Sequence, residues 1–119
     1  MAQSVLVLIT KAPYGYEDGF AGYRLALSQL AGGMITKCSV LLVADGALNA
    51  VASQKPDAVL MPSNIDPLND IFDLDSKVYC VVEDLEERVG SVEIVKGITK
   101  VTWTEARKVI TEHDLVTTF

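Results

Sequence analysis

Apolar runs alternate with amphipathic stretches along this chain of 119 residues. Continuous runs rich in branched side chains, such as SVLVLI and CSVLLVA, are typical of strands that are buried on both faces of a sheet. The pattern predicts three such strands at residues 4–9, 38–44 and 77–82. Residues 92–95 are predicted as a fourth strand, and residues 115–119 as a closing strand.

Between these strands, apolar residues recur at the spacing of a helix. The first helix is predicted over residues 20–30 and ends at the Gly32-Gly33 pair. Shorter helices are predicted at residues 47–53 and 83–89. Residues 58–61 suggest a short extended piece, followed by a turn or helix that runs to residue 72.

The last helix has the clearest start signal in the chain. The segment Thr102-Trp103-Thr104-Glu105 has the spacing of a capping box. The residues that then suit one buried helical face are Trp103, Ala106, Val109, Ile110 and His113. His113 is therefore predicted to be a packed residue, not a catalytic base.

The alternation of strands and helices predicts an α/β sandwich with a mostly parallel sheet of roughly five strands. Parallel strands need crossover connections, and right-handed crossovers place helices on the faces of the sheet. The length fits a single domain over residues 1–119, because such a chain can bury one core without disulfides or metals.

Composition narrows the classes of function. The net charge is −6 and the basic residues are scattered singly, which argues against direct nucleic-acid binding. No apolar run approaches the roughly 18–20 residues that span a bilayer, and MAQSVLVLIT has no basic leader. Two cysteines make a poor disulfide framework, so free thiols in the cytoplasm are expected.

Ligands of open parallel sheets bind beyond the carboxyl ends of the strands. Three segments are predicted to meet there: TKAPYGYEDG, ADGALN and CVVED. Exposed aromatics at the tip of the first loop, Tyr14 and Tyr16, favour an interface or a pocket wall. The candidate binding residues of these loops are Lys11, Pro13, Tyr14, Gly15, Asp45 and Gly46.

Cys80 is the only thiol predicted near this edge, because Cys38 begins its strand at the opposite edge. The helix that follows Cys80 would favour a thiolate, whereas Glu83 and Asp84 oppose one. Cysteine is also among the most buried residue types, so Cys80 could be a plain core residue. Lys11 or Arg88 could offset the acidic pair, but the sequence does not place them.

Other chemistries lack their residues. One histidine and two cysteines cannot supply the usual zinc ligands, so no metal site is expected. The glycines at positions 15, 19 and 22 do not have dinucleotide-binding spacing, and no phosphate-binding lysine loop is present. Asp45 is not accompanied by the acidic pair of a phosphoacceptor site, and Asp45-Gly46 is typical of a turn.

Several blocks of the sequence resemble a known family. ADGALNAVASQKPDAVL resembles the second-strand block of the DsrF/TusC sulfur-relay proteins, VLITKAPYG resembles their APxG loop, and HDLVTTF resembles their closing strand. The similarity runs in order along nearly the whole chain. We therefore identify a resemblance to the DsrE/DsrF-like family, nearest its DsrF/TusC branch.

This resemblance implies a three-layer α/β/α subunit that assembles into hexamers with DsrE/TusD-like and DsrH/TusB-like subunits, or with itself. Such assemblies relay sulfane sulfur as cysteine persulfide between donor and acceptor proteins, in tRNA thiolation or dissimilatory sulfur metabolism, without a cofactor. CVVEDL matches the CVxxxL pattern of the sulfur-carrying cysteine in the DsrE/TusD branch. It departs from that branch at Glu83-Asp84, where small apolar residues are usual.

Two functions follow. In the first, the protein is a sulfurtransferase subunit in which Cys80 carries the persulfide, and this requires a thiol that opens onto the loop edge. In the second, it is a non-catalytic scaffold that holds partner subunits.

Overall fold

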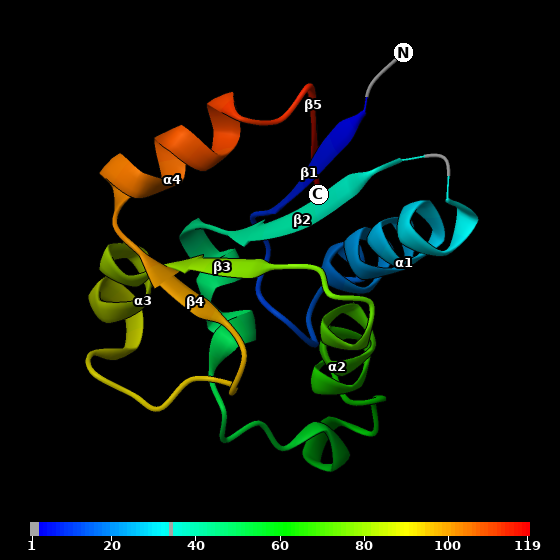
Figure 1. Cartoon of the computed structure of the whole chain (residues 1–119). Coiled ribbons are helices and arrows are strands. Elements are labelled where there is room, and N and C mark those ends of the chain that lie inside the picture. Colours follow the sequence, from blue (N-terminus) through cyan, green and yellow to red (C-terminus); the bar gives the residue numbers. More distant parts are fainter. Residues whose placement is uncertain (1–2, 34) are drawn as a thin grey trace.

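The computed structural model describes residues 3–33 and 35–119. Its strands are β1 (Ser4–Ile9), β2 (Lys37–Leu42), β3 (Val78–Val81), β4 (Thr99–Val101) and β5 (Leu115–Thr118). They form one parallel sheet with the order β4-β3-β2-β1-β5 (Figure 1). All four strand pairings are parallel, which confirms the predicted α/β class.

Helices lie on both faces of the sheet, as the three-layer prediction requires (Figure 1). One face packs against α1 (Asp18–Gly32), α2 (Ile65–Asp73) and the 3-10 helix η1 (Ala44–Ala50). The other face packs against α4 (Trp103–Thr111). Helix α3 (Val82–Val89) follows β3 and contacts η1, and a second 3-10 helix, η2 (Pro56–Val59), projects from the body.

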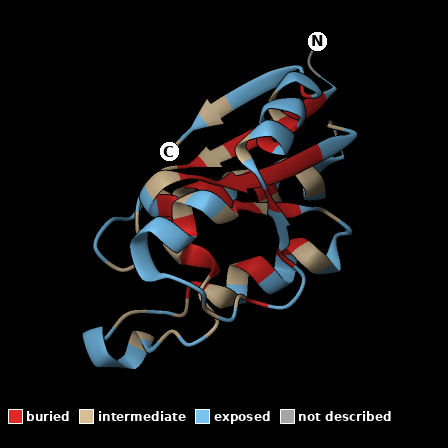
Figure 2. Ribbon diagram, turned by 90° about the vertical axis from the view of Figure 1, so that its left-hand side faces the viewer, coloured by how far each residue is buried: buried red, intermediate tan, exposed pale blue. Residues whose placement is uncertain are grey.

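Neighbouring residues of each strand serve opposite cores because side chains alternate between the faces of a sheet. In β1, Val5 and Val7 point to the face of α1, and Leu6 points to the face of α4. In β3, Val78 and Cys80 share the face of α1. Figure 2 shows the resulting band of buried residues along the sheet. Each fully buried Val or Leu side chain contributes about 1.5–3 kcal/mol, so this double core stabilises the sheet.

The predicted ends of two helices are confirmed. Gly33 ends α1 with a left-handed φ of 69°. At the start of α4, the Thr102 hydroxyl accepts a hydrogen bond from the Glu105 amide at 3.2 Å, and the Glu105 carboxylate accepts one from the Thr102 amide at 3.0 Å. His113 is buried behind α4, as the periodicity predicted.

The predicted strand at residues 92–95 is wrong. The strand that extends the sheet is β4, seven residues further on, and it pairs with β3 through Tyr79 and Thr99. Ile94 instead makes an isolated antiparallel bridge with Val51, and Val95 packs into the core beneath η1. Val95 is therefore buried beside η1, where its amide donates to the carbonyl oxygen of Ala50 at 2.7 Å, and residues 92–95 do not pair within the sheet.

The segment after β2 also differs from prediction. The expected helix at residues 47–53 is the 3-10 helix η1, which begins earlier, at Ala44. The expected extended piece at residues 58–61 contains the end of η2 and a turn with Leu60 at a φ of 56°. Within the described part of the chain, no helix has the length and apolarity that a bilayer crossing demands.

Candidate functional site

The three predicted loop segments do meet at the carboxyl edge of the sheet. The residues that follow β1 contact η1, because the side-chain amide of Asn49 donates to the carbonyl oxygen of Lys11 at 3.0 Å. η1 in turn contacts α3, which continues directly from β3. Lys11 and Gly15 are exposed, and Pro13 is half-buried.

Gly46 allows η1 to lie directly against the end of β1. A Cβ atom at this position would lie 1.9 Å from the carbonyl oxygen of Ile9, so no other residue fits without movement of the backbone. The Gly46 amide donates to the carbonyl oxygen of Val43 at 2.8 Å. Gly46 is therefore a close-packing position in the structure, whereas its neighbour Asp45 is exposed.

Tyr14 ties the first loop to the segment that leads into α2. Its hydroxyl donates to the side-chain oxygen of Gln54 at 2.6 Å and accepts from the backbone amide of Asn64 at 3.0 Å. Gln54 also donates to the carbonyl oxygen of Asn49 at 2.9 Å. The expectation that both loop tyrosines are exposed holds only for Tyr16, because Tyr14 is half-buried in this network.

Cys80 lies at the carboxyl end of β3, and its side chain points into the core. Its exposed fraction is 0%, and its Sγ lies 3.9 Å from the carbonyl oxygen of Ala47 in η1. η1 therefore covers the thiol on the face where α1 and α2 pack. An incoming protein cannot contact Cys80 in this conformation unless η1 moves.

The Asp84 carboxylate holds η1 in place. It accepts a hydrogen bond from the Ala44 amide at 2.7 Å and another from the Trp103 indole at 2.9 Å. Ala44 begins η1 with a left-handed φ of 52°, which costs an L-residue about 1–2 kcal/mol. Asp84 thus joins the starts of η1, α3 and α4, and we call the trio of Ala44, Asp84 and Trp103 the Asp84 clamp.

Two further residues of α3, Arg88 and Glu83, support the clamp. Arg88 donates to the Asp45 carboxylate at 2.8 Å and to the carbonyl oxygen of Asp84 at 3.1 Å. Glu83 accepts a hydrogen bond from the Trp103 amide. Because Asp45 is exposed, its ion pair with Arg88 is screened by solvent and contributes little compared with the Asp84 clamp.

The surroundings of Cys80 disfavour its thiolate. Burial, followed by the charge of Asp84, raises the pKa of the Cys80 thiol to about 12, against a smaller opposing effect of Lys100. At neutral pH the thiol is therefore protonated. Of the two cations that the sequence offered as compensation, Arg88 is paired with Asp45, and the Lys11 ammonium lies 5.3 Å from the centroid of the Tyr16 ring.

These buried thiols predict a loss of stability at alkaline pH. Burial raises the pKa of Cys38 to about 11 and contributes most to the value of about 12 for Cys80, against about 9 for an unshifted thiol. Above pH 9 the unfolded chain therefore releases protons that the native protein retains. The stability from protonated thiols is complete below pH 9, and the free energy of unfolding falls as the pH rises toward 12. Urea unfolding measured from pH 9 to pH 12 should show that the free energy of unfolding falls less steeply with pH for Cys80→Ala than for the wild type. Equal pH dependence in the two proteins would contradict the burial of this thiol.

Several residues of the edge were not singled out from the sequence. Asn49, Gln54 and Asn64 form the polar network under the first loop. Trp103, predicted only as a residue of the buried face of the last helix, belongs to the Asp84 clamp. Asp84 was weighed only as a charge near the thiol. Its two hydrogen-bond donors, the Ala44 amide and the Trp103 indole, belong to other elements, so its position in the first turn of α3 does not reveal this role.

The fold and this edge define a small parallel α/β protein whose strand-end cysteine is enclosed by η1. The crystal structure of the ychN protein from E. coli superposes with a TM-score of 0.86 and 21% identity, covering 98% of this chain and 99% of that chain. An uncharacterized protein of Methanopyrus kandleri is 28% identical over 113 residues, 94% of this chain and 83% of its own length. One of Methanocaldococcus jannaschii is 28% identical over 118 residues, 95% of this chain and 96% of its own length.

The DsrE/DsrF-like family matches residues 3–117. Because this match spans nearly the whole chain, the protein belongs to the DsrE/DsrF-like family. The likeness to the ychN structure, at 21% identity, establishes the shared fold.

Proposed function

We propose that this protein is a cytoplasmic subunit of a sulfur-relay assembly and helps transfer sulfane sulfur by holding partner subunits. Membership of the DsrE/DsrF-like family supports a sulfur-relay role. The observation that favours scaffolding over sulfur carriage is the position of the Cys80 thiol, which is buried beneath η1 beside Asp84. The contribution of the chain is then its surface, including the loop residues Lys11, Pro13 and Gly15 at the carboxyl edge.

The chemistry of a relay explains why the burial matters. In each step a thiolate attacks the outer sulfur of a donor persulfide, the donor leaves as a thiolate, and the new persulfide later gives up that sulfur to an acceptor thiol. A protonated thiol with no path to solvent cannot make this attack. Under the proposal, DsrE/TusD-like and DsrH/TusB-like subunits, or further copies of this chain, complete an assembly that binds the donor and acceptor proteins.

A second candidate is that Cys80 itself carries the persulfide. One observation favours it: the thiol lies at the end of β3, and its nearest polar contact in another element is with Ala47 of η1, a 3-10 helix of only seven residues. Release of η1 in the assembly would bring Cys80 to the edge where the loops meet.

Mass spectrometry after incubation with a persulfide donor separates the two candidates. A sulfur carrier gains about 32 Da, the mass of one sulfur atom, on Cys80. The scaffold proposal predicts no adduct on Cys80, and full relay activity when a Cys80→Ala subunit is placed in the assembled complex. Cys38→Ser serves as the matched control for the second thiol. An adduct that disappears in Cys80→Ser, together with loss of relay in an intact assembly, would contradict scaffolding and support carriage.

A further inference from the structure

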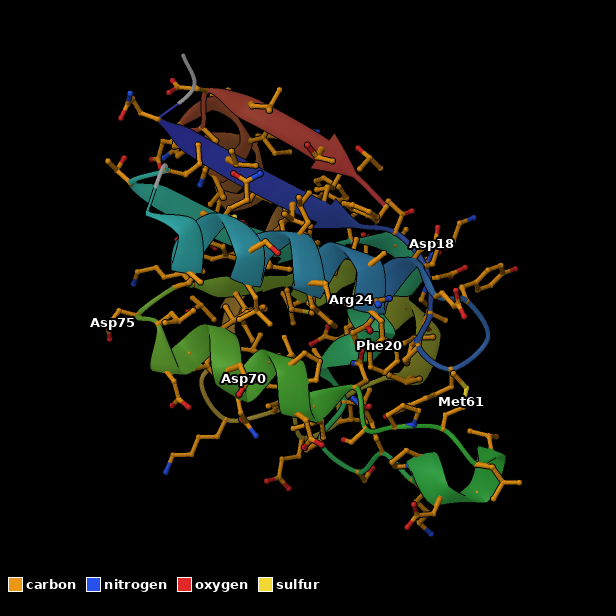
Figure 3. The ribbon with its side chains drawn as sticks, turned by 90° about the vertical axis from the view of Figure 1, so that its right-hand side faces the viewer. Asp18, Phe20, Arg24, Met61, Asp70 and Asp75 are labelled. Carbon is orange, nitrogen blue, oxygen red and sulfur yellow. The ribbon has the colours of Figure 1, made fainter. Side chains whose placement is uncertain are left out.

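An apolar hollow opens between the start of α1 and the segment that follows η2. Its volume is about 360 Å³, and its lining residues are Glu17, Phe20, Arg24, Met61 and Pro62. We call this surface the Phe20 patch. Figure 3 shows Phe20 and Arg24 on α1 and Met61 on the neighbouring segment. The centre of the patch is apolar, and its two charged residues come from α1.

The turn beside the patch displays apolar side chains to solvent. The side chain of Leu60 is 94% exposed and that of Val59 is 54% exposed. Both belong to the segment around η2 that projects from the body (Figures 2 and 3). Leu60 is held at a left-handed φ of 56° by the hydrogen bond from its amide to the carbonyl oxygen of Asp57 at 3.2 Å. An apolar tip next to an apolar hollow is typical of a surface that another molecule covers.

The two charged residues of the patch, Glu17 and Arg24, have opposite signs and lie on either side of Phe20. Glu17, Phe20 and Arg24 follow one another at helical spacing, so they line one side of the start of α1. Seven residues of helix span about 10 Å, and Phe20 lies near the midpoint between the two charges. Within residues 3–33 and 35–119 neither charge takes part in an ion pair; the Arg24 guanidinium only approaches the carbonyl oxygen of Phe20, at 3.4 Å.

We propose that the Phe20 patch joins two copies of this chain across a two-fold axis. If two α1 helices cross antiparallel at Phe20, Glu17 of each copy faces Arg24 of the other, and the two Phe20 rings meet at the centre. A two-fold contact requires a surface that is complementary to itself, and an apolar centre flanked by opposite charges meets that requirement. This inference rests on the proposed function as an assembly subunit and assigns the surface that makes the contact.

Charge reversal tests the contact directly. Glu17→Arg leaves two positive charges on the patch, and Arg24→Glu leaves two negative charges, so either variant alone repels its own copy at both sites. Analytical ultracentrifugation at about 0.1 mM should show association of the wild type and at least a tenfold weaker dissociation constant for each variant. An equimolar mixture of the two variants should recover association, because each reversed copy now faces an opposite charge. Lys96→Glu, an exposed reversal away from the patch, is the control and should associate like the wild type.

A monomeric wild type would overturn the proposal, as would variants that associate normally or a mixture that fails to recover. Circular dichroism of each variant checks that α1 still forms. This test is independent of the adduct experiment. Loss of the two-fold contact would leave a scaffold that acts through other subunits, whereas a sulfur adduct on Cys80 would reject the scaffold proposal and leave the contact in place.

Discussion

The Gly46→Ala variant is expected to lose at least about 4 kcal/mol of its free energy of unfolding, enough to prevent folding of a marginally stable domain. The added Cβ would lie 1.9 Å from the carbonyl oxygen of Ile9. The backbone fixes the positions of both atoms, so no side-chain rotation relieves the overlap. η1 would have to leave the end of β1. Urea unfolding followed by circular dichroism measures the loss.

Gly15→Ala is the matched control for this substitution. It adds the same methyl group to the neighbouring loop, where no atom lies within 4 Å of the new Cβ. Its free energy of unfolding should stay within about 0.5 kcal/mol of the wild type. If the two alanine variants were equally stable, η1 would not pack on β1 as described.

Asp84→Ala is expected to lower the free energy of unfolding by about 2–3 kcal/mol and to expose Cys80. The variant removes a charged acceptor from the Ala44 amide and from the Trp103 indole, and hydrogen bonds to charged groups contribute about 1.5–3 kcal/mol. Without that acceptor, the unfavourable backbone conformation of Ala44 has less to hold it, so η1 should open more often. Alkylation of Cys80 by iodoacetamide should become at least tenfold faster, because labelling follows the population of locally open states.

The control for this variant is Glu86→Ala, which removes an exposed carboxylate from the same helix. Its stability and its rate of Cys80 labelling should match those of the wild type. The stability and labelling rate of Asp84→Asn should lie between those of Asp84→Ala and Glu86→Ala, because an amide has one acceptor oxygen whereas the carboxylate has two. A variant Asp84→Ala that is as stable and as slowly labelled as Glu86→Ala would show that the Asp84 clamp does not hold η1.

The elements predicted with most success are those whose signals are local. Residues 4–9 form β1 as expected, and the capping box of α4 begins at Thr102, because a branched apolar run and a cap depend on adjacent residues. Residues 92–95 show why the prediction of other elements was wrong. Their pattern suits a strand, but their backbone pairs with Ala50, Val51 and Ala52 at the end of η1 and beyond it, and only the tertiary arrangement decides between this partner and β3.

The sequence predicted where the residues of the candidate site lie better than it predicted what they contact. The sequence placed Cys80 near the carboxyl edge, but the face of β3 that receives η1 determines whether the thiol is open or enclosed. Gly46 was chosen as a turn residue, and its close approach to Ile9 depends on two segments that are distant in sequence. The contact of Asp84 with Ala44 joins residues 40 positions apart, so no local pattern indicates it.

The glutamate and aspartate after Cys80 now have a structural role. The resemblance to the DsrE/TusD branch made them a departure at a cysteine motif. Glu83 and Asp84 accept hydrogen bonds from the start of α4, and Asp84 also accepts one from the start of η1. Asp84 therefore holds the start of η1, which covers the thiol, whereas Glu83 bonds only to the start of α4.

The scaffold proposal depends on the enclosure of the Cys80 sulfur atom, and thiol labelling of the native wild-type protein tests that enclosure most directly. Iodoacetamide at neutral pH should leave Cys80 unmodified over a period in which the urea-unfolded chain is labelled completely, as measured by peptide mass spectrometry. Modification of Cys80 in the folded protein at a rate near that of the unfolded chain would contradict the enclosure, and with it the proposal that this subunit acts through its surfaces.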